Sequence, residues 1–192
     1  MGIVVRPLTP ERWPALEDLL SESGAVSRCW CMYWRIGARY RQVPADQNRE
    51  AFRGIVQQGP PPGLLGFTDD TDDTAIGWCQ ITPREAAPAV ERIWRLKPVD
   101  DLPVWAITCL FVRKGYRRQG VTSVLIAEAL ALASNAGAPA VEAYPVDSAV
   151  SPSATGTGYA STFERAGFTV IARRTPSRPI MRYELSDRSV RP

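Results

Sequence analysis

The chain has 192 residues, 45% of them hydrophobic, and this length and composition predict one domain with a buried core. Its 23 basic and 20 acidic residues leave a net charge of +3, which is too balanced to favour a surface built for nucleic acid. It contains no histidine, and this excludes a Ser-His-Asp or Cys-His catalytic device.

The first third of the chain predicts one strand followed by two helices. Residues 3–8 form an apolar run typical of a strand. Thr9 then opens a Thr-Pro-Glu sequence, which is typical of a helix start, so a helix is expected to about residue 23. A second helix is expected over 45–58, because Gly59 and three prolines follow it.

The middle of the chain predicts a hairpin and then a buried strand. Residues 63–67 and 75–81 are expected to form two strands, joined by a turn rich in threonine and aspartate. The four aspartates of that turn lack the spacing of a calcium loop, so we interpret the turn as solvated. Residues 83–101 are charged and contain prolines, which predicts a surface excursion. The nearly continuous apolar run 104–112 predicts a strand covered on both faces.

The second half of the chain is organised around one long predicted helix. Apolar residues recur at three-and-four spacing over 120–136, which predicts a helix that buries one face and stops at Gly137. Beyond it, the sequence predicts a strand, a short helix, two further strands and a frayed tail, at residues 140–144, 159–166, 168–172, 180–185 and 186–192.

The four cysteines and the absence of long apolar runs bear on metals and on compartment. Cys29 and Cys31 are too close for an ordinary disulfide, and neither Cys79 nor Cys109 completes a metal-ligating spacing. We therefore expect free, mostly buried thiols and no metal. With no secretory signal and no run near ~18 apolar residues, the sequence predicts a soluble, cytoplasmic protein that does not bind membranes.

The turn between the buried strand and the long helix carries the most chemical information. It reads Arg-Lys-Gly-Tyr-Arg-Arg-Gln-Gly-Val-Thr over residues 113–122, so a glycine stands directly at the predicted helix start. A helix N-terminus presents unpaired N–H groups and partial positive charge, and glycine allows a diphosphate to approach the backbone. The alternative from these residues alone is an ordinary basic turn capped by glycine.

This turn resembles the acetyl-CoA-binding motif of the GCN5-related N-acetyltransferase (GNAT) superfamily, R/Q-x-x-G-x-G/A. Arg117, Gly120 and Thr122 take its three defined places, and the threonine hydroxyl can itself donate to a phosphate. The predicted order of strands and helices is also similar to that of the family. The resemblance implies a single domain over 1–185, with a mixed, mostly antiparallel sheet of about seven strands, about four helices and splayed central strands.

The resemblance also implies which residues bind acetyl-CoA. The backbone of Leu110, Phe111 and Val112 would pair with the pantetheine arm as an added strand does. The pyrophosphate would be held by the turn and the first helical turn, at Arg117, Arg118, Gln119, Gly120, Val121, Thr122 and Ser123.

The resemblance places the catalytic candidates in the last third of the chain. Phe163 stands where the family usually has a tyrosine that protonates the leaving thiolate, and Tyr159, one helical turn earlier, is the candidate substitute. Asp147 takes the place of a family asparagine and is either a base acting through water or a turn-forming aspartate. Glu142 is the other candidate base, although alternate strand residues face opposite ways.

The expected reaction is direct attack by a primary amine on acetyl-CoA in a ternary complex, with a small molecule or a protein amino group as acceptor. The family's acceptor cleft borders the first two helices, so the aromatic segment there is the candidate acceptor site, unless it is simply buried core. Arg28 and Arg35 beside it weakly favour an acidic acceptor. The candidate acceptor-binding residues are Trp30, Met32, Tyr33 and Trp34.

Three other interpretations were weighed against this one. Phe163 favours a non-catalytic acyl-CoA-binding or regulatory protein as the main alternative. A covalent route through Cys109 is disfavoured, because no histidine is present to make the thiolate. Nucleic-acid binding is disfavoured because the last arginines are expected to alternate along exposed strands. The sequence leaves both a monomer and a homodimer open.

Overall fold

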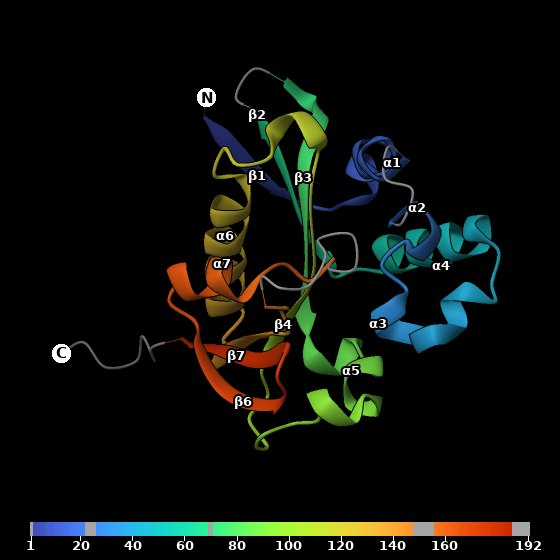
Figure 1. Cartoon of the computed structure of the whole chain (residues 1–192). Coiled ribbons are helices and arrows are strands. Elements are labelled where there is room, and N and C mark those ends of the chain that lie inside the picture. Colours follow the sequence, from blue (N-terminus) through green and yellow to red (C-terminus); the bar gives the residue numbers. More distant parts are fainter. Residues whose placement is uncertain (1, 22–25, 69–70, 148–155, 186–192) are drawn as a thin grey trace.

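One mixed sheet forms the centre of the computed structural model, which describes residues 2–21, 26–68, 71–147 and 156–185 (Figure 1). Within these residues the sheet has seven strands in the order β1-β2-β3-β4-β5-β7-β6. Every neighbouring pair is antiparallel except β4 and β5, which are parallel, as the resemblance implies. The strands are β1 Ile3–Pro7, β2 Gly63–Thr68, β3 Thr71–Pro83, β4 Trp105–Val112, β5 Ala140–Ala143, β6 Thr169–Thr175 and β7 Arg178–Glu184.

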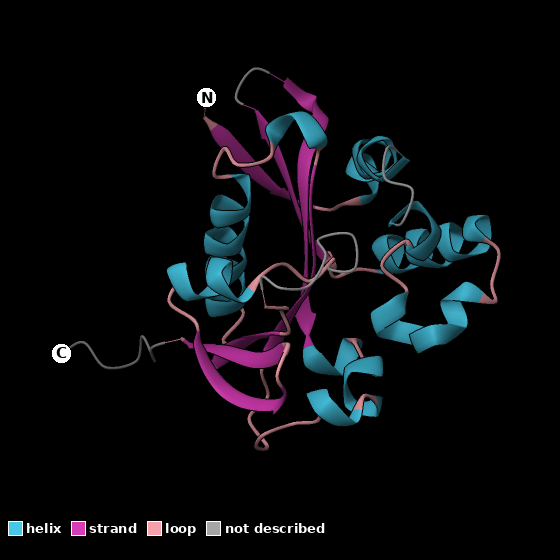
Figure 2. Cartoon of the chain, in the orientation of Figure 1, coloured by secondary structure: helices cyan, strands magenta, loops and turns pink. Residues whose placement is uncertain are grey.

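Helices cover both faces of the sheet (Figures 1 and 2). Helices α6 and α7 lie on one side, and α1 to α5 lie on the other. None of the described helices is both long and apolar enough to cross a membrane. The helices are α1 Trp13–Ser21, α2 Val26–Cys29, α3 Tyr33–Ile36, α4 Ala45–Gln58, α5 Ala89–Arg92, α6 Val121–Asn135 and α7 Ala160–Arg165, with 3-10 turns η1 Pro10–Arg12, η2 Gly37–Arg41, η3 Arg84–Ala86, η4 Trp94–Leu96 and η5 Lys114–Tyr116.

The long elements match the sequence predictions, and the short ones differ. Helix α4 spans the predicted residues, and α6 begins one residue after Gly120. The predicted surface excursion over 83–101 is wrong in part, because Arg84, Val90 and Leu96 are buried, the last two in one core cluster with residues of β4 and β7. Four-residue helices such as α2, α3 and α5 carry no periodicity that a sequence can show. The predicted tail 186–192 lies outside the described residues.

Helix α6 is seated on the sheet at Gly77 of β3. A Cβ added there would lie 2.7 Å from Val121 Cγ1 and 2.9 Å from Leu125 Cδ1, which no real side chain tolerates. Both α6 residues are buried in the core on this face of the sheet. The glycine therefore lets the first turn of α6, where the predicted pyrophosphate site lies, pack close against β3.

The central strands separate beyond a β-bulge in β4. Gln80 pairs with Cys109 and Ile81 with Ile107, so Thr108 is the extra residue. Strand β4 pairs with β5 only as far as Ile107 and Ala143. After that point the edge of β4 is free of β5, as the predicted splay requires.

Candidate active site

The turn before α6 is built from two left-handed residues. Arg118 has φ +62° and Gly120 has φ +84°, and such turns aim successive backbone N–H groups at one point. The first α6 hydrogen bond runs from Val124 N to Gly120 O, and no side chain in the described part of the chain caps the helix. The N–H groups of residues 121–123 therefore have no partner within the helix.

A hollow of about 370 Å³ opens in front of this helix start. The described residues that line it include three arginines and no carboxylate, so its electrostatic potential favours an anion. A Cβ on Gly120 would meet nothing within 4 Å, so the hollow reaches the backbone itself. Its lining residues are Val112, Tyr116, Arg117, Arg118, Gly120, Val121, Thr122, Ser123, Thr162 and Arg165.

This hollow brings together most, but not all, of the residues predicted to hold the pyrophosphate. Gln119 does not line it, because its amide donates to Gly115 O at 2.9 Å on the exposed side of the turn. Sequence reasoning missed Thr162 and Arg165, which reach the hollow from α7 about forty positions later in the chain. Their only signal was an exposed basic residue in the Phe-Glu-Arg-Ala-Gly-Phe stretch.

Alternate residues of β4 face the gap between the central strands. Arg113 N donates to Ile76 O on β3, whereas Leu110 N points the other way and donates to Gly156 O at 2.7 Å. By this alternation the backbone of Leu110 and Val112 faces the gap, and that of Phe111 faces β3. Val112 O accepts a hydrogen bond from Arg117 Nε at 3.1 Å. The backbone of Leu110 and Val112 can therefore pair with a ligand in the gap, whereas that of Phe111 cannot.

The segment before α7 occupies part of this gap. Gly156 O holds Leu110 N, and Gly158 O accepts from Val146 N at 3.1 Å. A Cβ on Gly158 would lie 3.3 Å from both Leu110 Cδ1 and Phe163 Cε2. The edge of β4 is thus covered at Leu110 by the chain itself, rather than open as the sequence led us to expect.

Tyr159, the candidate acid, lies at the start of α7, one helical turn before Phe163. Tyr159 is half-buried at the N-cap, just before the helix, and forms a parallel bridge with Val146. Its hydroxyl makes no hydrogen bond with another described residue. Phe163 is fully buried and packs edge-to-face on Phe168 at 5.1 Å. Of these two residues, only Tyr159 has a hydroxyl that could donate a proton.

The two candidate bases have very different surroundings. Glu142 is fully buried, and its Oε2 accepts from Arg84 Nη1 at 2.7 Å and from the Tyr144 hydroxyl at 2.9 Å. Its Oε1 accepts from Arg182 Nη2 at 2.8 Å. Both carboxylate oxygens of Glu142 already accept hydrogen bonds from the protein, so neither is available to act as a base. Burial, together with the charge of Glu142, raises the pKa of Tyr144 well above its ordinary value. Asp147 is partly exposed and pairs with Arg173 at 2.7 Å.

The predicted acceptor-binding aromatics are mostly core residues. Trp30, Met32 and Trp34 are each no more than 6% exposed. Trp30 stacks on Trp13 with ring centroids 5.8 Å apart, which explains its burial. Of the four, only Tyr33 is half-buried, and it packs edge-on against Trp34 and Tyr40. The alternative of a buried core element therefore describes three of the four.

The cysteines of this region are packed against one another. All four cysteines are free thiols. Cys31 accepts a hydrogen bond from Trp78 Nε1 at 3.2 Å, and a hydrogen bond with Cys109, together with burial, raises the pKa of Cys31. Burial also raises the pKa of Cys29 to about 11. Such thiols are almost entirely protonated at neutral pH, so neither is an activated nucleophile.

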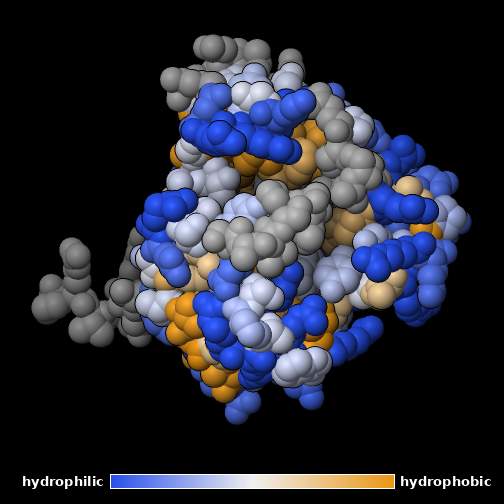
Figure 3. Space-filling model, in the orientation of Figure 1, coloured by the Kyte–Doolittle hydropathy of each residue, from blue (hydrophilic) through white to orange (hydrophobic). Residues whose placement is uncertain are grey.

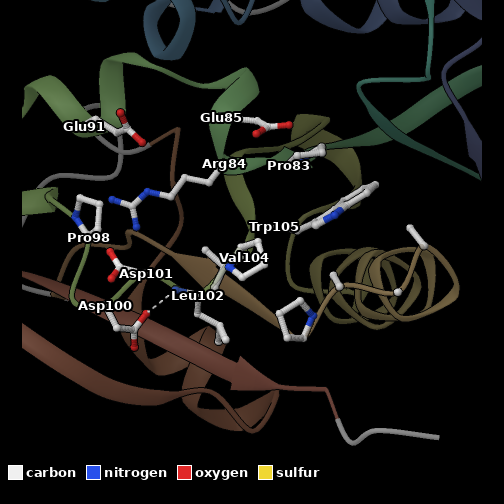
Figure 4. Close-up of a pocket in the computed structure, with 15 residues that line it drawn as sticks. Pro83, Arg84, Glu85, Glu91, Pro98, Asp100, Asp101, Leu102, Val104 and Trp105 are labelled. Atoms are coloured by element: carbon white, nitrogen blue, oxygen red, sulfur yellow. Dashed lines mark hydrogen bonds between the residues drawn. The ribbon is translucent and has the colours of Figure 1, made fainter. Parts of the chain in front are cut away.

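A second hollow, of about 520 Å³, lies at the other end of α6 (Figure 4). The Arg84 side chain crosses it between Glu91 on one side and Asp101 on the other. Helix α6 has 15 residues, about 22 Å at 1.5 Å per residue, and separates the two hollows. This hollow is thus remote from the glycine turn. In the space-filling view the visible surface is mainly hydrophilic, with hydrophobic residues in separate patches (Figure 3).

Comparison with known proteins agrees with this geometry. A sequence model described as the acetyltransferase (GNAT) family matches residues 26–149. No curated protein matches the chain. PaiA N-acetyltransferase from Thermoplasma acidophilum, solved with coenzyme A, has TM-score 0.57 and 18% identity, covering 96% of this chain and 100% of that one.

Two further solved structures share the fold. NAA60 from Arabidopsis thaliana, in complex with acetyl-CoA, has TM-score 0.55 and 14% identity, covering 96% of this chain and 100% of that one. The NatC complex bound to Gag peptide and CoA has TM-score 0.59 and 14% identity, with 97% and 100% covered. At these identities the likeness establishes the fold.

Proposed function

We propose that this chain, which belongs to the acetyltransferase (GNAT) family, transfers an acetyl group from acetyl-CoA to a primary amine. The observation that carries the proposal is the hollow before α6, where unpaired helix N–H groups and three arginines meet with no carboxylate among the lining residues. A diphosphate fits such a site in charge and in the close approach that Gly120 allows.

Each part of the cofactor has a proposed partner in the chain. The N–H groups of Val121, Thr122 and Ser123 hold the pyrophosphate. Arg118, from the turn before α6, and Arg165, from α7, add positive charge. The backbone of Leu110 and Val112 pairs with the pantetheine arm. When bound, acetyl-CoA supplies a thioester whose carbonyl carbon the amine attacks.

Leu110 N–H is the proposed donor to the thioester oxygen. It already points into the gap and holds one carbonyl oxygen, that of Gly156, at 2.7 Å. That oxygen stands in for the thioester oxygen, and the proposal requires Gly156 to release the bond when the ligand enters. A fixed backbone donor of this kind stabilises the negative charge that develops during attack.

Proton transfer is assigned to Tyr159 and to solvent. We propose that Tyr159 donates a proton to the leaving thiolate, because Phe163 has none to give. Asp147 is the remaining carboxylate candidate for the base, through water, and it would first have to leave its ion pair with Arg173. An acceptor ammonium with a pKa near ~10 loses its proton more readily as the pH rises, so the rate should increase with pH in either case.

We expect Tyr159→Phe to lower kcat by about a hundredfold, the lower end of what a positioned acid contributes, without changing KM for acetyl-CoA. The measurement is a steady-state thiol-release assay at saturating amine. Tyr183→Phe is the control, since Tyr183 packs on Phe168, which follows the C-terminal end of α7. A kcat for Tyr159→Phe equal to that of the control would remove Tyr159 as the acid.

The transfer itself is tested by thiol release from acetyl-CoA with a panel of amines. The panel contains small amines, lysine peptides and peptides with free N-termini, because the NatC complex was solved with a peptide. We expect amine-dependent release and an N-acetylated product visible by mass spectrometry.

Phe163 supports a second candidate, a non-catalytic acyl-CoA sensor, because it removes the usual proton donor. Such a protein would bind acetyl-CoA in equilibrium dialysis but release no thiol with any amine of the panel. That result would replace the enzymatic proposal with the sensor.

A further inference from the structure

Arg178 lies close to the edge of β4 that receives the thioester in the proposed function, and the segment Gly156–Thr157 stands between them. Its Nη1 donates to Tyr144 O at 2.9 Å and lies 3.4 Å from Thr157 Oγ1. Thr157 directly follows Gly156, whose carbonyl holds Leu110 N at 2.7 Å. Adjacent α-carbons are about 3.8 Å apart. The guanidinium is therefore within the length of a small molecule from the reacting atoms.

Arg178 has no carboxylate partner among the residues that the structure describes. Arg84, Arg113, Arg173 and Arg182, which also flank the sheet, each pair with an aspartate or glutamate. Arg178 is half-buried, so its charge is poorly compensated by water. A second cation, Arg95, stands near it instead. Burial, together with the charge of Arg95, lowers the pKa of Arg178.

The donors that Arg178 leaves unused form one edge of its guanidinium. Nη1 serves the backbone of Tyr144, whereas Nε and Nη2 make no hydrogen bond with described residues, and neither is among the buried unsatisfied atoms. Both are therefore open to solvent. Parallel donors on one planar edge match the two oxygens of a carboxylate. Tyr33 is near enough to Arg178 to act on it electrostatically.

We infer that the acceptor is an amine that also carries a carboxylate, and that the Nε–Nη2 edge of Arg178 binds this carboxylate while the amine faces Leu110. The inference rests on the proposed acetyl transfer and names its class of acceptor. In a purely structural role, Arg178 would only donate its hydrogen bond to Tyr144 O, just after β5, and would not contact the acceptor. The two roles differ in whether the acceptor's charge matters.

The test compares matched pairs of acceptors that differ only in charge: glycine and glycinamide, leucine and leucinamide, and phenylalanine and phenylalaninamide. O-phosphoethanolamine and ethanolamine form one phosphate pair. KM and kcat are measured by thiol release for the wild type, Arg178→Gln, Arg178→Lys and a control, Arg53→Gln. Arg53 is exposed on α4, so the control removes one charge away from the gap. Comparing the ratio within a pair between variants cancels the different pKa of the two amines.

We expect at least one acid to be preferred over its amide, and Arg178→Gln to raise KM for that acid by about tenfold to hundredfold, the loss of a charge-assisted pair. KM for the amide, kcat and KM for acetyl-CoA should stay within about twofold. Arg178→Lys should retain part of the preference, and Arg53→Gln all of it. Equal loss for acid and amide, or a preference that survives Arg178→Gln, would overturn the inference, as would a preference confined to the phosphate pair.

A binding measurement separates this inference from the proposed transfer. Equilibrium dialysis of each N-acetylated acid and N-acetylated amide is carried out in the presence of CoA, with the wild type and Arg178→Gln. Tighter binding of an acid that disappears in Arg178→Gln supports the inference even if no thiol is released, in which case only the transfer has failed. Equal binding of acid and amide in every pair overturns the inference even if the transfer is observed.

Discussion

Gly120→Leu should weaken coenzyme A binding by about a hundredfold or more while the chain stays folded. The added side chain would stand in the hollow where the pyrophosphate approaches the N–H groups of α6, since nothing of the protein lies within 4 Å of a Cβ there. Losing two charge-assisted hydrogen bonds at about 1.5 kcal/mol each gives this magnitude. Isothermal titration with coenzyme A measures it.

The chain offers a matched control at the other end of the same helix. Gly137 also has a left-handed backbone, with φ +77°, and open space around its Cβ position. Leucine at either position should cost about 1–2 kcal/mol of folding free energy from backbone strain, but only Gly120→Leu should lose the ligand. Equal coenzyme A affinities in the two variants would place the pyrophosphate elsewhere.

Glu142→Ala should lower the free energy of unfolding by about 3–5 kcal/mol. The substitution leaves Arg84, whose side chain is 9% exposed, without its carboxylate and removes one of the three carboxylate partners of Arg182. An uncompensated buried charge is among the costliest defects a fold can carry. Urea denaturation followed by tryptophan fluorescence measures the loss, and Glu142→Gln should give an intermediate value.

Two further variants show whether the cost comes from the stranded charges. Asp147→Ala breaks an exposed pair with Arg173 and should cost no more than about 1 kcal/mol. Adding Arg84→Met to Glu142→Ala should cost less than the sum of the single changes, because one stranded charge is removed with its partner. A stable Glu142→Gln protein that binds acetyl-CoA but has lost kcat would contradict this account and restore Glu142 as a catalytic base.

The structure brings most of the residues predicted for the pyrophosphate together in one hollow, because these residues are local in the sequence. Gly120 and its neighbours are consecutive residues, and a helix start with glycine and arginine has the same meaning in any fold. The sequence left the surroundings of Glu142 open, because alternation along a strand does not say which face of the sheet a residue joins. It also left open whether the aromatic segment is core or cleft, which depends on partners such as Trp13.

By itself, the sequence determined the order of the long elements, the α6 start and the family resemblance, because these depend on periodicity and on neighbours within a few residues. Only the tertiary structure decided that Arg165 joins the hollow before α6, that Gly156 covers Leu110, and that Glu142 is buried between two arginines. Each of these unites residues more than 35 positions apart. Such contacts follow from how the sheet and helices pack, and no local pattern encodes them.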